Sequence, residues 1–138
     1  RRVVLGEIDE LCIKCCELNV QLYERVCGRA PAEIHKVSFG DTTIAGLQRS
    51  FDLVCGADIL YNGSVLKPLV ATVAGVGADQ SVALISFTCR TDKQNSAPVE
   101  FKALTDAMVA QGFRRSQEIE STGSAEKTFC QVQAFSRG

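Results

Sequence analysis

The chain is a series of apolar blocks whose spacing changes repeatedly between that of β-strands and that of α-helices. Four short apolar runs have the length and composition of buried strands. They are residues 3–7, 34–37, 51–57 and 82–88. Three longer segments repeat their apolar residues at intervals of three and four, which predicts helices. They are residues 9–26, 64–73 and 98–111.

The first predicted helix has the most regular pattern. Its apolar positions are Leu11, Cys15, Leu18 and Leu22. Charged and amide side chains lie mostly on the opposite side, so the apolar side is expected to face the core. Asp9 suits the N-cap position, and Gly28 is expected to end the helix.

The later elements end in a predicted hairpin. Ser64 is expected to cap the second helix, and residues 75–79 are expected to turn the chain into the next strand. Gly75-x-Gly77 is not interpreted as a phosphate loop, because such a loop follows a strand and precedes a helix. The inward positions are predicted to be Leu66, Leu69, Val70 and Val73 in the second helix and Phe101, Leu104 and Met108 in the third. After Gly112, residues 113–119 and 128–135 predict two antiparallel strands.

This order of elements predicts an α/β fold. Strands that alternate with helices indicate a doubly wound, mostly parallel, Rossmann-like sheet, here with a C-terminal antiparallel hairpin. The length of 138 residues fits a single domain, residues 1–138. Residues 51–57 are apolar on both faces, which is typical of a parallel strand between two layers of helices. In such sheets, ligands bind at the carboxyl ends of the strands.

Charge and hydropathy narrow the possible partners. The formal net charge is −1, which gives no electrostatic reason to expect a nucleic-acid surface. No apolar run approaches the roughly 20 residues that a helix needs to cross a bilayer. Neither nucleic acid nor membrane is therefore predicted as a partner.

Seven cysteines raise the question of disulfides or a metal site. An odd number of cysteines without a secretory signal favours a reducing compartment, so a cytoplasmic location is expected. Cys12-x-x-Cys15 has no second pair to complete a zinc site, and the single histidine, His35, is distant in the sequence. We expect no metal site and free cysteines that pack as small buried side chains.

The end of the third strand-like run carries polar residues suited to chemistry. Asp58 and Tyr61 directly follow residues 51–57, and Glu7 ends the first run. These positions are the carboxyl ends of predicted strands, where ligands bind in this class of fold. A structural interpretation is also open, because Asp58 could cap the following helix and Tyr61 could pack over that helix.

Taken in order, these features resemble the class I, seven-β-strand methyltransferases that use S-adenosylmethionine, and within them the methyltransferase-like protein-lysine branch. Residues 51–61 look like the Asp-x-x-Tyr signature of that branch. Residues 37–40 are similar to its strand ending in Trp-Gly, with Phe39 in place of tryptophan. Asn19-Val20 and Gly112-Phe113 match shorter features of the family. The resemblance covers nearly the whole chain.

The resemblance implies S-adenosylmethionine as the cofactor and suggests roles for particular residues. Glu7 matches the acid that accepts hydrogen bonds from the ribose hydroxyls, and Ser38 and Phe39 match the positions that flank the adenine. Asp58 matches a residue at the methionine end of the cofactor. There Asp58 and Tyr61 would orient a neutral amine for attack on the methyl group. From the residues alone, Glu7 could equally be a helix cap and Phe39 a core residue.

The same resemblance predicts an incomplete fold. The family begins with a strand and a Gly-rich loop, whereas this chain begins at what resembles the family's second strand. Because the first strand is central in that family's sheet, its absence would leave backbone groups unpaired. The chain could be the C-terminal portion of a longer enzyme, could receive the strand from another chain or segment, or could have lost cofactor binding.

Two functions follow from these alternatives. The first is transfer of a methyl group from S-adenosylmethionine, with a lysine of a protein substrate as the expected acceptor. The second is a non-catalytic, methyltransferase-like scaffold or assembly subunit.

Overall fold

The computed structural model describes residues 2–29, 31–41, 44, 46–60, 62–88, 101–121 and 130–138. The chain divides into two compact units, Arg1–Ser38 and Phe39–Gly138. The prediction of a single domain over residues 1–138 stays a prediction.

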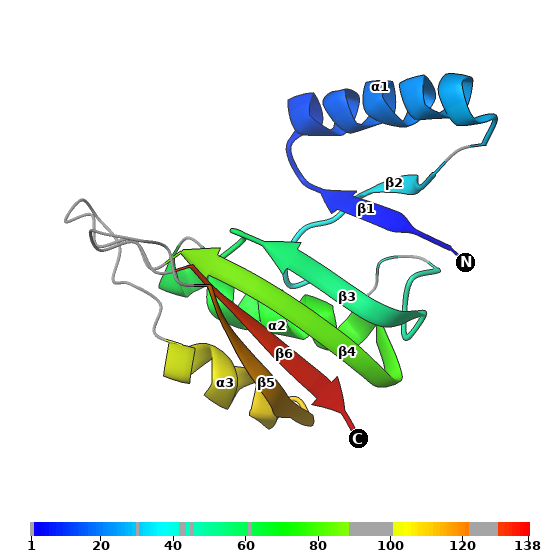
Figure 1. Cartoon of the computed structure of the whole chain (residues 1–138). Helices are drawn as coiled ribbons and strands as arrows, with labels where there is room; N and C mark the ends of the chain where they lie inside the picture. The colour runs from blue at the N-terminus through cyan, green and yellow to red at the C-terminus, as the bar shows by residue number, and fades with distance from the viewer. Residues whose placement is uncertain are drawn as a thin grey trace. The chain divides into compact units, whose positions relative to one another are not determined.

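The first unit is a strand–helix–strand motif. Strand β1 (Val4–Glu7) is followed by helix α1 (Glu10–Cys27) and strand β2 (Glu33–Lys36), as Figure 1 shows. The two strands are parallel, with Val4 opposite Glu33 and Glu7 opposite Lys36. All three elements confirm the sequence prediction to within a few residues.

Both ends of α1 form as predicted. The side chain of Asp9 accepts hydrogen bonds from the backbone N–H groups of Leu11 and Cys12, each at 2.9 Å. These bonds satisfy two donors that the first turn of a helix leaves without partners. Gly28 ends the helix in the left-handed conformation, with φ 72°, and its N–H donates to the carbonyl of Glu24 at 2.7 Å.

The face of α1 that the pattern assigned to the core is exposed. Leu11, Leu18 and Leu22 are 72%, 65% and 61% exposed, and Cys15 is exposed as well. The partly buried positions of the helix are Ile13, Cys16 and Val20. The prediction of the inward face was therefore wrong for this unit. The apolar arc of α1 is wider than one contact face, and the two strands of the unit cover only part of it.

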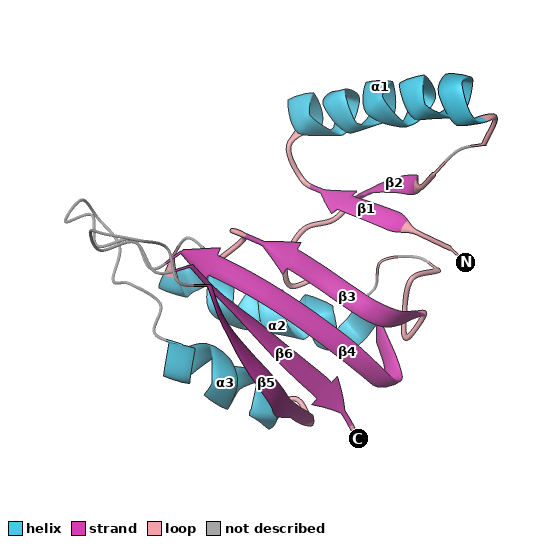
Figure 2. Cartoon of the chain, viewed as in Figure 1, coloured by secondary structure: helices cyan, strands magenta, loops and turns pink. Residues whose placement is uncertain are grey.

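The second unit contains a four-stranded sheet. Its elements are β3 (Phe51–Ala57), α2 (Gly63–Val76), β4 (Gly77–Thr88), α3 (Phe101–Ala110), β5 (Phe113–Ser121) and β6 (Cys130–Arg137). The strand order is β3-β4-β6-β5, in which β3 and β4 are parallel and β6 is antiparallel to both β4 and β5 (Figure 2). The parallel strand–helix–strand unit and the terminal antiparallel hairpin are both confirmed.

The core of the second unit lies between its sheet and helices α2 and α3, which contact each other. Five predicted inward residues are buried, and they are Leu69, Val70, Val73, Leu104 and Met108. The face of β3 that points away from this core carries Leu53, which is 54% exposed. The described residues of this unit therefore leave that face uncovered. The expectation that this strand is covered on both faces is therefore not met within the unit.

Helix α2 differs from its prediction at both ends. Asn62, and not Ser64, is the N-cap, because its side-chain oxygen accepts from the backbone N–H of Ser64 at 2.9 Å. The helix runs on to Val76, and β4 begins at the next residue, so no separate turn forms at residues 75–79.

Distant groups satisfy the last carbonyls of this helix. The backbone N–H groups of Arg49 and Ser50 donate to the carbonyls of Gly75 and Val76, each at 2.9 Å. The guanidinium of Arg137 donates to the carbonyl of Ala74 at 2.8 Å. With these partners in place, the end of the helix needs no loop of its own.

The five cysteines whose side chains the structure describes are free but are not buried as expected. Cys12, Cys15, Cys27 and Cys55 are exposed and Cys16 is partly buried. The expectation of buried cysteines was wrong for these residues. The exposed thiols of α1 lie within the part of the helix surface that its own unit leaves uncovered.

Candidate functional site

Asp58 lies directly after β3, at the carboxyl edge of the parallel pair. Its backbone N–H donates to the carbonyl of Ser86 at 2.9 Å, which continues the β3–β4 ladder by one residue. Its φ is 52°, in the left-handed region, where aspartate and asparagine are several-fold enriched among non-glycine residues. Asp58 is exposed, whereas Leu60, two residues later, is only 3% exposed. The backbone thus presents Asp58 at the surface as the chain turns back into the core.

The helix-cap alternative for Asp58 does not hold. The N-cap of α2 is Asn62, which accepts from the backbone N–H of Ser64. Asp58 lies four residues before that cap. Tyr61, the other half of the predicted pair, lies outside the described residues. The structure therefore places Asp58 at the predicted sheet edge.

Glu7 ends β1, also as predicted. Its Oε1 accepts from the backbone N–H groups of Ile8 at 2.7 Å and Asp9 at 3.1 Å. These bonds fix the turn between β1 and α1, while the capping bonds to α1 itself come from Asp9. Both bonds to Glu7 end on Oε1, so Oε2 takes no part in them. The carboxylate is oriented by the backbone but is not the helix cap.

Ser38 and Phe39 have contrasting environments. Ser38 is exposed, whereas Phe39 is partly buried and packs against the core of the second unit. The next residue, Gly40, has φ 94° and donates its backbone N–H to Oγ1 of Thr72 on α2 at 2.9 Å. The hydroxyl of Thr72 in turn donates to the carbonyl of Pro68 at 3.1 Å. This packing favours the structural interpretation of Phe39 as a core residue.

The predicted site residues fall in both units. Glu7 and Ser38 belong to the first unit, and Phe39 and Asp58 belong to the second. Within the second unit, Phe39 and Ile59 both pack against the same buried core that contains Leu60. The segment after β2 and the turn after β3 therefore share a packing environment.

The largest pKa shift in the first unit is that of Glu33, which is not one of the predicted site residues. The guanidinium of Arg2 donates twice to the carboxylate of Glu33, at 2.8 Å each, and this lowers the pKa of Glu33 to about 2. At the start of α1, the backbone N–H of Cys12 lowers the pKa of Asp9. Partial desolvation and the neighbouring Asp9 raise the pKa of the Cys12 thiol, whereas a redox-active thiol needs a lowered pKa.

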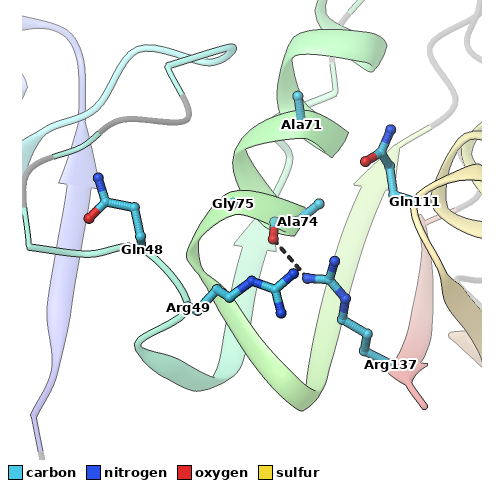
Figure 3. Close-up of a pocket in the computed structure, with 7 residues that line it drawn as sticks. All are labelled: Gln48, Arg49, Ala71, Ala74, Gly75, Gln111 and Arg137. Carbon is cyan, nitrogen blue, oxygen red and sulfur yellow. Dashed lines mark hydrogen bonds between the residues drawn. The ribbon is translucent and has the colours of Figure 1, made fainter.

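A pocket of about 370 Å³ lies at the opposite end of the sheet from Asp58. It is lined by Gln48, Arg49, Ala71, Ala74, Gly75, Gln111 and Arg137, which Figure 3 shows around the C-terminal end of α2. Arg49 forms an ion pair with Asp79. Arg137 donates to the end of α2, and its guanidinium lies 5.4 Å from the centre of the Phe113 ring. The guanidinium of Arg137 thus binds the end of α2, whereas that of Arg49 binds β4.

Among the described residues, no helix is long and apolar enough to cross a membrane. Among the same residues, no group of three or more histidine, cysteine, aspartate or glutamate side chains is placed to hold a metal ion.

The pattern missed two residues that shape the Asp58 turn. Asn62 was not predicted as the cap of α2, although asparagine is among the most favoured N-cap residues. Gly56 was counted as part of an apolar run, although a glycine within a strand often marks a close approach of other atoms. The Ile59 side chain lies against Gly56, where a Cβ would be only 3.1 Å from Cγ1 of Ile59.

The family of the chain is shown by a comparison of sequence. Residues 1–104 match the model of a family described as lysine methyltransferase. The match covers three quarters of the 138 residues, so the chain belongs to this methyltransferase family. No curated protein sequence matches the chain.

Solved structures show the same fold at low sequence identity. Magnesium protoporphyrin IX methyltransferase from Synechocystis PCC 6803, with SAH bound, is 13% identical with a TM-score of 0.74. The similarity covers 99% of this chain and 64% of that enzyme. A second structure of the enzyme, with SAM bound, is 14% identical with a TM-score of 0.72 and coverage of 99% and 60%. The chain therefore spans less than two thirds of the length of this enzyme.

Two other structures show how widely the fold is used. A SAM-dependent methyltransferase from Methanosarcina mazei is 13% identical, with a TM-score of 0.70 and coverage of 99% of this chain and 82% of that one. The cyclase SpnF is 7% identical, with a TM-score of 0.77 and coverage of 99% and 66%. The predicted Rossmann-like methyltransferase fold is confirmed. Because one of these proteins is named a cyclase, the fold by itself does not define a reaction.

Proposed function

We propose that the protein containing this chain transfers a methyl group from S-adenosylmethionine to a lysine side chain of a protein substrate. The observation that carries the proposal is the match of residues 1–104 to the lysine methyltransferase family. The methyltransferase fold supports it, since structures with this fold hold SAH and SAM. The choice of lysine as the methyl acceptor is supported only by the function for which the family is described.

The residues present suit the cofactor. Glu7 has a carboxylate that two backbone N–H groups orient through one oxygen, and a carboxylate can accept further bonds from a vicinal diol. We assign it to the ribose hydroxyls. Ser38 and Phe39 would flank the adenine, and Asp58 would lie at the methionine end. The bound cofactor supplies an electrophilic methyl group on a sulfonium.

The role of the chain's own residues is to position the acceptor. The lysine amine must be neutral to attack, so its proton has to leave before or during the transfer. Asp58, exposed at the sheet edge, and Tyr61 would accept and donate hydrogen bonds that hold the amine in line with the methyl group. The transfer would form an N–C bond and break the C–S bond, the sulfur would keep the electron pair of the broken bond, and the proton of the amine would pass to water.

A second function is favoured by one specific observation. The ring of Phe39 packs against the core of the second unit, where the family resemblance would assign it to the adenine. If the ring keeps this packing in the whole protein, it does not contact the adenine. A methyltransferase-like scaffold or assembly subunit, with no affinity for the cofactor, is the alternative function.

Methyl transfer tests the proposal directly. The full-length protein, supplied with methyl-tritiated S-adenosylmethionine and an array of lysine-containing peptides, is expected to label some of them. Asp58→Asn is the sharpest variant, because asparagine tolerates the left-handed backbone and only the charge is lost. We expect Asp58→Asn and Tyr61→Phe each to reduce the rate by about 100-fold or more, as when a preorganised polar group is lost.

The chain offers a matched control for each substitution. Asp52→Asn changes an exposed aspartate within β3, and Tyr23→Phe changes an exposed tyrosine on α1. Both controls should retain the wild-type rate. Unchanged transfer in Asp58→Asn and Tyr61→Phe would remove the assigned roles, and no labelling by the folded full-length protein would favour the scaffold.

A further inference from the structure

The turn that carries Asp58 is built around a glycine that another side chain covers. The side chain of Ile59 folds back over Gly56, three residues earlier. A Cβ at position 56 would collide with Cδ1 of Ile59 and lie 3.1 Å from its Cγ1. The same Cβ would lie 3.6 Å from Cδ1 of Ile85, the residue opposite Gly56 in β4. The space next to Gly56 is therefore filled by Ile59.

The backbone is anchored on both sides of Asp58. Before Asp58, the strand is held in register with β4, where Gly56 pairs with Ile85. After it, Ile59 packs partly buried against the core, and Leu60 is only 3% exposed. Asp58 itself connects the two with φ 52°. Because both neighbours of this left-handed residue are anchored, the direction of its Cα–Cβ bond is set by the backbone.

We propose that Gly56 and Ile59 act as positioning residues for Asp58. The absence of a side chain at Gly56 lets Ile59 lie against the strand, and this contact fixes where the backbone directs the Asp58 carboxylate. The proposal rests on the proposed methyl transfer, since it gives the turn a purpose in aligning the acceptor. A displacement of about 1 Å in such a group can cost about 100-fold in rate.

A purely structural role of this contact would have different consequences. If the contact only contributed packing, Gly56→Ala would reduce the stability of the protein and the fraction that is folded. The rate per folded molecule would stay unchanged. A positioning role instead reduces kcat of the folded molecules, and it is reversed when the collision is removed.

The test variants change the side-chain volume at the contact between positions 56 and 59. Gly56→Ala adds one methyl group against Ile59, and Ile59→Val removes the Cδ1 methyl with which it collides. The double variant Gly56→Ala/Ile59→Val therefore conserves volume. Gly63→Ala is the matched control, because nothing lies within 4 Å of a Cβ at that position and its φ is not positive.

The experiment measures kcat and KM of the full-length protein on the peptide that it labels best, normalised to the folded fraction from circular dichroism. We expect Gly56→Ala to lower kcat by about 10- to 100-fold and to change KM for the peptide by less than about threefold. The double variant should recover to within about threefold of the wild-type rate. Gly63→Ala should be close to wild type.

A second readout does not depend on activity. In ¹⁵N NMR spectra, Gly56→Ala should shift the backbone amide signal of Asp58, and the double variant should return it toward the wild-type position. An unmoved Asp58 signal, a Gly56→Ala rate within about twofold of wild type, or a double variant as slow as Gly56→Ala overturns the proposal. An inactive wild type overturns the proposed function and the proposed effect of Gly56 and Ile59 on kcat. The amide signals still test whether the contact between Gly56 and Ile59 positions the Asp58 backbone.

Discussion

At the scale of single residues, the Arg2–Glu33 pair shows how a local contact sets the charge state of a side chain. The guanidinium donates through both Nε and Nη2, so the pair is bidentate, and it joins the start of the chain to β2. The Nε2 atom of His35 also lies 3.3 Å from the Glu33 carboxylate. These contacts favour the ionised carboxylate and depress its pKa.

We predict that the pKa of Glu33 is about 2 in the folded protein, below its ordinary value of 4.5. A lowered folded-state pKa means that the pair contributes stability above pH 4.5. This contribution is lost as the pH falls from there toward 2. A ¹³C NMR titration of the Glu33 side chain measures the pKa.

Arg2→Gln removes the main cause and should return the pKa of Glu33 toward 4.5. Arg29→Gln, at another exposed arginine of the same unit, is the matched control and should leave the pKa low. If the Glu33 carboxyl titrates near 4.5 in the wild type, the ion pair does not form in solution.

Residue-scale prediction from the sequence succeeded where the signal was local. The cap at Asp9, the stop at Gly28 and the position of Asp58 at the end of β3 depend on residues close in the sequence, and all three are confirmed. The contact between Gly56 and Ile59 could not be predicted, because it depends on which way the chain turns after the strand. The roles of Glu7 and Asp58 toward a cofactor stay predictions.

At the scale of elements, α2 shows the division between local and distant causes. Its N-terminal end is determined by residues close in the sequence, since the side-chain oxygen of Asn62 accepts from the N–H of Ser64 two residues later. Its C-terminal end depends on Arg49, Ser50 and Arg137, which are far from it in the sequence. No local pattern contains those partners, so the sequence predicted an end at residue 73 and a turn that does not form.

We predict that Asn62→Ala lowers the free energy of unfolding by about 1 kcal/mol, the typical effect of losing an N-cap. The reason is that α2 packs its buried side chains into the core of the second unit, so fraying of its first turn weakens that core. Urea denaturation followed by circular dichroism measures the change.

Asn62→Asp keeps a cap acceptor and should be nearly as stable as the wild type. Asn19→Ala, at an exposed position within α1, is the matched control and should change the stability by less than about 0.5 kcal/mol. Equal stability of Asn62→Ala and the wild type would mean that this capping bond does not contribute.

At the scale of the whole molecule, each unit has a surface that suits a further partner. In the described residues, β1 pairs only with β2, and β3 pairs only with β4. The apolar side chains Leu11, Leu18, Leu22 and Val26 of α1 are 61–77% exposed. Exposed strand edges and apolar stripes of this kind are normally paired or covered in a stable protein.

We expect cofactor binding to depend on whether these strand edges and apolar side chains are covered. The residues assigned to the cofactor fall in both units, Glu7 and Ser38 in the first and Phe39 and Asp58 in the second. Residues in separate units bind one ligand tightly only when a further segment has already ordered them, because otherwise the entropy of ordering them weakens binding.

We predict that residues 1–138 alone bind S-adenosylhomocysteine weakly or not at all, and that a polypeptide extended upstream through an apolar strand and a Gly-rich loop binds it. Isothermal titration calorimetry of both polypeptides, each checked for folding by circular dichroism, makes the comparison. Equal binding by the two would show that Glu7 and Asp58 do not need a bridging strand. Binding by neither, with both folded, would favour a scaffold, because the fold would then be retained without its cofactor.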